Sequence, residues 1–356
     1  MDSIIILIEM IQKQLNWNKQ RIDFLAKFLI TLIKVRTVNL AIIAESFPGN
    51  AKIESHYKRE QRFFRNFKID FTVIASFITS LLPKENGWIL TLDRTDWKLG
   101  KTPVNILVLG IAHKGAAFPI LWVSLPKKGN SNTKERIELF NRFFEHFGKE
   151  RINYIACDRE FIGKDWFKFL LKSKVDFRIR VRENFKVPNR NGKKISVKLL
   201  FRNLAIHKKM VLRKPRLICG HKLYISGMRL LDGDYLILVT PEFNSKSIED
   251  YAKRWEIETL FGCLKTRGYN FEDTHLTKPE RIDKLLAILA IAFAWAHIIG
   301  EWFHEQKPLK IKNHGRLIKS IFRHGLSKLR NVLANLEFAE NKIDEFYFFC
   351  EFLSCT

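Results

Sequence analysis

Apolar residues recur every three to four positions through the first 84 residues, a period that predicts amphipathic helices. The expected helices are Ile4–Leu15, Ile22–Ile33, Val38–Phe47, Ile53–Phe67 and Phe71–Leu82. The turn-forming residues Pro48-Gly49-Asn50 join the third and fourth segments into a pair with the length of a helix-turn-helix. We therefore assign residues 1–84 to an all-helical domain.

The second helix of this pair is strongly cationic. Its basic residues are His56, Lys58, Arg59, Arg62 and Arg65, and aromatic residues are interleaved with them. This pattern favours a recognition helix that lies in a DNA groove, with Arg59 and Arg62 as expected contacts. The alternative is an ordinary bundle helix whose charged face is solvated.

From Trp88 onward the pattern changes to short β-rich segments separated by turn residues. The expected strands are Trp88–Asp93, Val104–His113, Ala117–Leu125, Ile152–Cys157 and Val175–Val181. Helices are expected at Lys134–Phe147 and Lys164–Ser173. Three strands, helix, strand, helix, strand is the succession of an RNase H-like α/β core, and residues 85–181 form its first part.

A basic segment then interrupts the core. From Arg178 to Lys222 the chain has fifteen Lys or Arg against a single acid, Glu183. The expected strands in and after this segment are Phe185–Val187, Ile195–Phe201, Met210–Leu212, Leu217–Ser226 and Tyr235–Val239. We interpret residues 182–232 as a β-rich insertion that binds DNA phosphates, with a merely solvated sheet as the alternative.

Residues 233–305 are expected to complete the core and to contain a long buried helix over Pro279–Glu301. Residues 306–356 form a C-terminal region in which Lys307–Arg330 is basic and free of acids, and Leu336–Leu353 is acidic and aromatic. We interpret the basic run as a second DNA contact and the tail as a packing or dimerisation element.

The overall composition agrees with a nucleic-acid partner. Lys plus Arg outnumber Asp plus Glu by 62 to 37, which gives a net charge of +25. A folded, aromatic-rich chain with this excess is typical of proteins that bind polyanions.

The five cysteines are scattered, which indicates neither a disulfide framework nor a zinc site and fits the cytoplasm. No secretory signal is evident, and the uncharged run Leu285–Gly300 is short for a membrane span, so a soluble protein is expected.

One predicted helix, Tyr251–Lys265, places polar groups at the edge of an apolar stripe. At 100° per residue, Tyr251, Arg254, Glu258 and Lys265 fall within an arc of about 60°. Ser245 or Ser247 is the expected N-cap, and Gly268 is expected to end the helix. An ordinary Arg–Glu pair one turn apart is the alternative interpretation.

Two aspartates upstream follow predicted strands and supply further carboxylates. Asp93 ends the run Trp-Ile-Leu-Thr-Leu-Asp, and Asp158 follows Ile152–Cys157. Three carboxylates in one pocket repel one another unless cations neutralise them, and a pair of Mg²⁺ ions would do so. Asp96 and Glu160 rank lower, because Asp96 would face away from Asp93 and Glu160 lies past the expected strand end.

The spacing Tyr251-x2-Arg254-x3-Glu258-x6-Lys265 resembles the YREK signature of the bacterial DDE transposases of the insertion sequence 4 family. The segments around Asp93 and Asp158 resemble the first two acidic motifs of that family, and the resemblance covers about residues 37 to 305. It implies an RNase H-like fold in which Asp93 bridges two Mg²⁺ or Mn²⁺ ions while Asp158 and Glu258 each bind one.

The resemblance also implies an activity. The protein would cut the terminal inverted repeats of an insertion sequence with water and then join the freed 3′-hydroxyl to target DNA. The implied partners are double-stranded DNA and a second copy of the chain in a synaptic complex, in the bacterial cytoplasm at the nucleoid. Two other functions remain open: a catalytically inactive DNA-binding descendant of a transposase, and an RNase H-like nuclease.

Several DNA contacts are expected near the carboxylates. By resemblance, Arg254 and Lys265 would hold phosphates of the transposon end and Tyr251 would contact the backbone. Lys98 and Arg159 flank the aspartates and are expected to act similarly. Some members of the family stack a flipped base on a tryptophan in the insertion. This insertion has none, so Phe185 or Tyr224 would have to substitute, and hairpin formation does not carry over.

Overall fold

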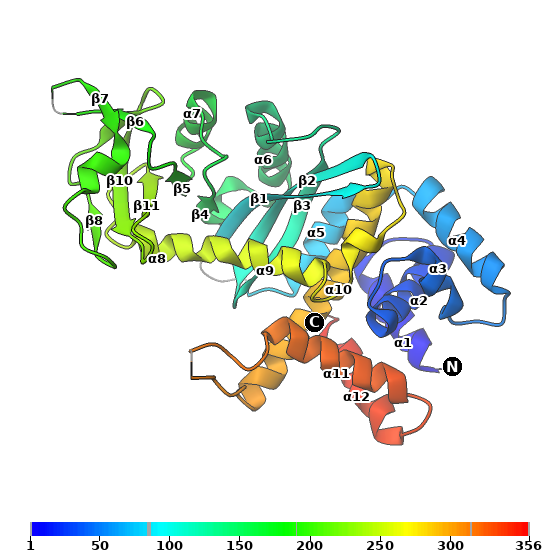
Figure 1. Cartoon of the computed structure of the whole chain (residues 1–356). Coiled ribbons are helices and arrows are strands. Elements are labelled where there is room, and N and C mark those ends of the chain that lie inside the picture. The colour runs from blue at the N-terminus through cyan, green and yellow to red at the C-terminus, as the bar shows by residue number, and fades with distance from the viewer. Residues whose placement is uncertain (1, 84–86, 190, 314, 355–356) are drawn as a thin grey trace.

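The computed structural model describes residues 2–83, 87–189, 191–313 and 315–354. A twisted sheet occupies the middle of the molecule, with the N-terminal helices at one end and small basic strands at the other (Figure 1). Two C-terminal helices lie along one side of this body. The protein is therefore a mixed α/β protein, as the pattern of the sequence predicts.

The N-terminal part consists of five helices. They are α1 (Asp2–Gln14), α2 (Lys19–Val35), α3 (Leu40–Glu45), α4 (Ile53–Asn66) and α5 (Phe71–Ser80). Asn18, Asn39 and Asp70 cap α2, α3 and α5 by accepting hydrogen bonds from backbone N–H groups of the first turn. All five predicted helices are present, although α3 is shorter than predicted.

The central sheet is mixed. Its strands are β1 (Trp88–Leu99), β2 (Thr102–His113), β3 (Ala116–Ser124), β4 (Ile152–Cys157), β5 (Phe177–Val181), β8 (Lys209–Val211), β10 (His221–Arg229) and β11 (Tyr235–Thr240). Their order is β3-β2-β1-β4-β5-β11-β10-β8, with β1, β4 and β5 parallel. The helix α6 (Thr133–Phe147) leads from β3 to β4, and α7 (Lys164–Lys172) leads from β4 to β5. An RNase H-like core fits this arrangement.

The basic segment after β5 differs in detail from the prediction. The predicted strand Ile195–Phe201 is wrong in its second half: β7 (Lys194–Ser196), paired with β6 (Lys186–Pro188), gives way to the 3₁₀ turn Val197–Phe201. The predicted strand Leu217–Ser226 is broken at Cys219 and Gly220, whose φ angles of 49° and 84° form a turn between β9 (Arg216–Ile218) and β10.

This basic segment is joined to the core. Strand β10 pairs with both β11 and β8, so part of the segment extends the central sheet. The limits of the insertion at 182 and 232 stay a prediction.

The predicted helix Tyr251–Lys265 is divided into three parts. It consists of α8 (Ser247–Tyr251), the 3₁₀ turn Ala252–Arg254, and α9 (Trp255–Leu264). The predicted serine cap is wrong: Lys246 occupies the N-cap position without a side-chain bond, and the buried Ser247 hydroxyl instead pairs with Ser226 at 2.6 Å. Gly268 lies beyond the end of α9, where a Cβ atom would collide with the Cys263 carbonyl.

The helix α10 (Pro279–Gln306) forms the centre of the fold. It contacts β3, α2, α4, α5, α9 and α11. By length and composition it could cross a membrane, but 94% of its most apolar stretch is buried inside the protein. The prediction of a long buried helix is confirmed.

Two further helices, α11 (Ile321–Asn335) and α12 (Glu340–Phe352), follow α10. Phe346 and Phe349 of α12 are buried, and α12 contacts α1 as well as α11. The aromatic tail therefore packs within the chain. Its part in dimerisation stays a prediction.

Candidate active site

Parallel pairing of β1 and β4 brings the two aspartates next to each other. The register pairs Leu92 with Cys157, so Asp93 and Asp158 are the next residues along the two strands. Asp158 follows the end of β4, as predicted. Asp93 is not at a strand end, because β1 continues to Leu99 and pairs with β2 over its whole second half.

The α8–α9 segment supplies the third carboxylate and connects it to the aspartates. The Arg254 guanidinium donates to Asp93 at 3.3 Å and to Glu258 at 2.6 Å. The Tyr251 hydroxyl lies 3.5 Å from an Asp158 oxygen, and Arg180 of β5 lies 4.0 Å from the same carboxylate. Three carboxylates from distant parts of the chain therefore surround Tyr251 and Arg254.

Burial makes this cluster electrostatically unusual. Desolvation raises the pKa of Asp93 to about 7, and the nearby carboxylates of Glu160 and Asp158 add to the rise while Arg254 opposes it. Arg254 is only 4% exposed; burial acts to lower its pKa, but Tyr251, Glu258 and Asp158 together raise it above the usual value. Asp93 is therefore protonated more readily than an ordinary aspartate, and the Arg254 guanidinium opposes this only in part.

The chemistry of the donors fits a hard divalent cation. All three candidate ligands are carboxylates, the oxygen donors that Mg²⁺ and Mn²⁺ prefer. Within the described residues, however, no group of three or more His, Cys, Asp or Glu side chains is arranged to hold one ion. Arg254 provides the counter-charge between Asp93 and Glu258, and this arginine would have to release one of them for a cation to enter.

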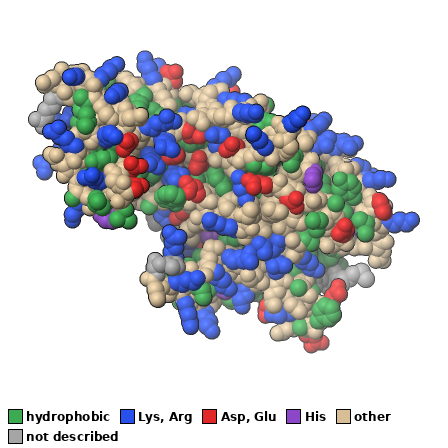
Figure 2. Space-filling model, viewed as in Figure 1, with side chains coloured by type: hydrophobic (Ala, Val, Ile, Leu, Met, Phe, Trp, Pro, Cys, Tyr) green, Lys and Arg blue, Asp and Glu red, His purple; other side chains and the backbone are tan. Residues whose placement is uncertain are grey.

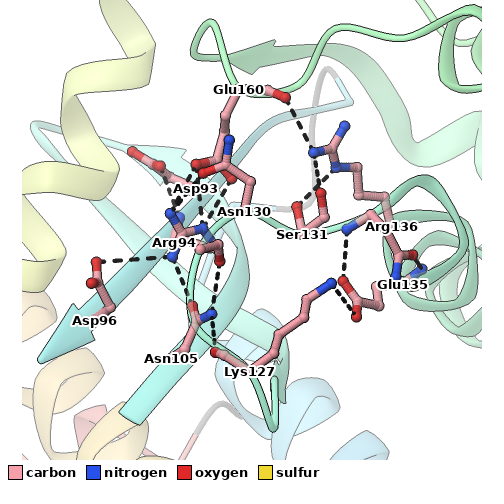
Figure 3. Close-up of polar contacts among 12 residues, drawn as sticks. Asp93, Arg94, Asp96, Asn105, Lys127, Asn130, Ser131, Glu135, Arg136 and Glu160 are labelled. Atoms are coloured by element: carbon pink, nitrogen blue, oxygen red, sulfur yellow. Dashed lines mark hydrogen bonds and ion pairs between the residues drawn. The ribbon is translucent and has the colours of Figure 1, made fainter. Parts of the chain in front are cut away.

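A polar network anchors the loops after β3 and β4 to strand β1 (Figure 3). Arg94, 12% exposed, points away from Asp93 and donates to Glu160 at 3.2 Å, to Asn105 at 2.8 Å and to Asn130 at 3.2 Å. Arg136 of α6 bonds the backbone carbonyl of Glu160 and the side chain of Ser131. The loops after β3 and β4 are thereby fixed to β1. The Glu160 carboxylate pairs with Arg94 in this network.

The cations expected to bind DNA lie in different environments. Lys98, Arg159 and Arg62 are exposed. Arg59 instead pairs with Asp23 at 2.9 Å and stacks on Phe24. Lys265 pairs with Glu272 at 2.7 Å and lies over the ring of Trp97, so it is not in contact with Glu258.

Aromatic residues near the site also differ in position. Tyr251 is 3% exposed and faces Asp158, inside the protein. Of the two residues considered for base stacking, Phe185 packs partly against the core and Tyr224 contacts Phe243 edge-on. Trp255 was not among the predicted site residues; it is 58% exposed, and its ring centroid lies 4.8 Å from the Arg254 guanidinium. Its position directly after Arg254 in the sequence could have marked it as a residue of the site.

The cysteine beside the site is inert. Cys157 is fully buried, and desolvation raises the pKa of its thiol far above the usual range. All four cysteines among the described residues are free thiols, in agreement with the expectation of no disulfide framework.

Comparisons with known proteins bear on the family of the chain. Residues 85–295 match the family described as "Transposase DDE domain". No curated protein matches the chain. A solved piggyBac transposase, in a synaptic complex with hairpin DNA, is similar at 13% identity and a TM-score of 0.46, over 92% of this chain and 75% of that one.

Proposed function

The chain belongs to the transposase DDE domain family, whose members are metal-dependent, DNA-cleaving polynucleotidyl transferases, and from this premise we propose a specific activity. The protein is an insertion sequence transposase of the insertion sequence 4 type with a YREK signature. It binds the terminal inverted repeats of its element, cuts DNA at those ends, and transfers the freed 3′-hydroxyl to target DNA.

One observation carries this proposal. Arg254 contacts both Asp93 and Glu258, and Tyr251 contacts Asp158, so two signature residues are in contact with all three acidic residues. Segments 161 residues apart in sequence meet in that contact. A structural ion pair would need only one carboxylate. An arginine between two carboxylates, with a third carboxylate beside them, supports a site that binds cations and phosphate groups together.

Each residue of the site has a distinct role in this proposal. Asp93, Asp158 and Glu258 would hold two Mg²⁺ or Mn²⁺ ions, which would supply activation of the attacking oxygen and stabilisation of the leaving oxygen. Arg254 exchanges a carboxylate for a phosphate oxygen as DNA enters, because guanidinium forks suit both groups. Tyr251 orients the Asp158 carboxylate through its hydroxyl. The exposed cations Lys98 and Arg159 bind the flanking backbone.

The proposal also covers the DNA partners, the number of copies that act together and the place of action. Transposon ends and target are both double-stranded DNA, and two copies of the chain act together in a synaptic complex. The exposed cations of α4, Lys58, Arg62 and Arg65, support DNA reading by the N-terminal helices. The place of action is the bacterial cytoplasm, at the nucleoid.

The test uses the full chain and duplexes that carry the inverted repeats flanking its gene. Wild-type protein should nick these ends in Mg²⁺ and not in EDTA. Glu258→Gln should bind the same duplexes with unchanged affinity and cut them at least 10²-fold more slowly, since it removes a metal ligand at a half-exposed position. Lys134→Gln, at an 85% exposed lysine of α6, is the matched control.

Three results would contradict the proposal. Cleavage that ignores the terminal sequence would indicate a general nuclease. Binding without any cleavage in Mg²⁺ or Mn²⁺ would indicate an inactive DNA-binding protein. Wild-type cleavage by the Glu258 variant would remove that residue from the site.

A further inference from the structure

Four arginines near α2 and α11 form a row, and three of them donate hydrogen bonds to backbone carbonyls. Arg36, at the end of α2, donates to the carbonyls of Gly268 at 3.1 Å and Arg267 at 3.3 Å. Arg323 of α11 donates to the same Arg267 carbonyl at 3.3 Å, and Arg330 donates to the Lys34 carbonyl at 3.2 Å. We call Arg36, Arg267, Arg323 and Arg330 the arginine seam.

The seam carries unbalanced positive charge. Across the described residues, none of its four guanidinium groups forms an ion pair with a carboxylate. The pKa of Arg36 is lowered, first by burial and then by repulsion from Arg323 and Arg330. Figure 2 shows Lys and Arg side chains gathered where the body of the molecule meets α11. Cations held close together without acids favour a polyanionic ligand.

At one end of the seam the surface is hollowed. A cavity of about 430 Å³ is lined by, among others, Lys114, Thr259, Arg267, His297, Arg316 and Ser320. The first residues of the 15-residue helix α11 also line it, and such a helix start attracts anions. Lys114 pairs with Glu301 and Glu305 of α10, so its single positive charge is shared between two carboxylates.

A buried histidine in this cavity needs a partner. His297 is 1% exposed, and in the described structure neither ring nitrogen makes a hydrogen bond of normal geometry. Burial lowers its pKa to about 4, with Lys114 and His113 as additional causes, so the ring is neutral and offers one N–H donor. A buried donor without a well-formed hydrogen bond is unfavourable, and an oxygen ligand would satisfy it.

The cavity adjoins the candidate catalytic helix. Thr259 follows Glu258 directly on α9, and Gly262 lies one turn further on. Because Gly262 has no Cβ, the Arg267 side chain can lie against the helix; a Cβ there would be 3.1–3.2 Å from three of its atoms. Arg267 is therefore positioned by contact with α9, and it links the cavity to the seam.

From these contacts we propose that the arginine seam is a track for the DNA backbone and that the cavity at its end seats one phosphate group of the same strand. This site rests on the proposed function, because it presumes a DNA substrate. It would hold the duplex at a fixed distance from Glu258 through contacts to the backbone, with no reading of bases. It would also connect α2 and α11 to the catalytic helix through one ligand.

The first experiment measures duplex affinity by fluorescence anisotropy over a range of salt concentrations. Each arginine that contacts a phosphate adds about 1 to the slope of log K against log salt. Arg323→Gln and Arg330→Gln should each make the slope shallower by about 1, whereas Lys134→Gln should leave it unchanged. Arg323→Lys keeps the charge and should retain most of the slope.

A second variant tests position without changing charge. Gly262→Ala displaces Arg267 while improving helix propensity, so the protein should be at least as stable to heat as the wild type. Its DNA affinity should nevertheless fall several-fold. Inorganic phosphate, titrated calorimetrically at low salt, should bind the wild type and fail to bind His297→Leu and Gly262→Ala.

The outcomes separate this site from the proposed function. If Arg323→Gln, Arg330→Gln and Gly262→Ala all bind DNA like the wild type, the track is refuted while end-specific cleavage still supports the transposase. If the wild type does not bind duplex DNA, the proposed function fails and the track fails with it. If phosphate does not bind the wild type, the seat in the cavity is refuted.

Discussion

A buried carboxyl group in α4 provides the sharpest stability prediction. Glu60 is fully buried against the N-terminal helices, and neither of its oxygens has a hydrogen-bond partner in the described structure. Desolvation raises its pKa to about 8. A glutamic acid of the unfolded chain titrates near pH 4.3, so folding keeps this group protonated over a wide pH range.

The sign and size of the effect follow from this difference. The folded protein holds one more proton than the unfolded chain between about pH 4 and 8, so the free energy of unfolding falls as pH rises through that window. Each pH unit contributes about 1.4 kcal/mol, and the full window amounts to about 3–5 kcal/mol after some relaxation of the buried site. Glu60→Met removes this loss and should stabilise the protein progressively as pH rises.

Urea unfolding followed by circular dichroism checks this at pH 5 and pH 8.5. Replacing Glu60 by Met changes the free energy of unfolding by a packing contribution that does not depend on pH. Beyond that contribution, the free energy of unfolding of the variant should exceed that of the wild type by about 1 kcal/mol at pH 5 and by about 3–5 kcal/mol at pH 8.5. Glu54→Gln, at an exposed carboxylate in the first turn of α4, is the matched control and should show no such pH dependence. A difference between Glu60→Met and wild type that is independent of pH would refute the reasoning.

Three further predictions concern the site and the packing of α10. Arg254→Gln leaves Asp93 and Glu258 without their shared cation, so the free energy of unfolding should fall by about 2–4 kcal/mol. Mg²⁺ should raise the melting temperature of this variant more than that of the wild type. Gly325→Ala places a Cβ against the Ala296 carbonyl and should cost about 1–3 kcal/mol in thermal unfolding, whereas Ser327→Ala on the exposed face should be nearly neutral. Lys284→Met removes the bond from α10 to the Phe64 carbonyl and should cost about 1–2 kcal/mol in urea unfolding.

The fold could be predicted from the sequence where hydrophobic periodicity and turn residues agree. Strand β4 has the predicted ends, because apolar alternation stops abruptly at Asp158. Strand β1 was cut short in the prediction, since its second half carries polar residues that pair with β2 at the edge of the core. The break at Cys219 and Gly220 had one signal in the sequence, the glycine, whereas a left-handed non-glycine residue such as Cys219 has none.

The candidate site was predictable as a set of residues but not as a set of contacts. Helical spacing places Arg254 beside Glu258, and this pair is present. Its second bond, to Asp93, depends on how α9 crosses the sheet, which local patterns do not encode. The arginine seam was only partly predictable. Arg323 and Arg330 lie in the basic run that was expected to contact DNA, but Arg36 and Arg267 join them through backbone carbonyls, which every residue carries and composition does not mark.

The central position of α10 affects how the protein can change over time. A single buried helix supports the N-terminal helices, the sheet with the acidic residues, and the C-terminal pair. No part can therefore be exchanged for its counterpart from a distant relative without matching this shared surface. Adaptation to new terminal repeats is consequently expected through exposed side chains of α4, and seldom through the replacement of whole modules.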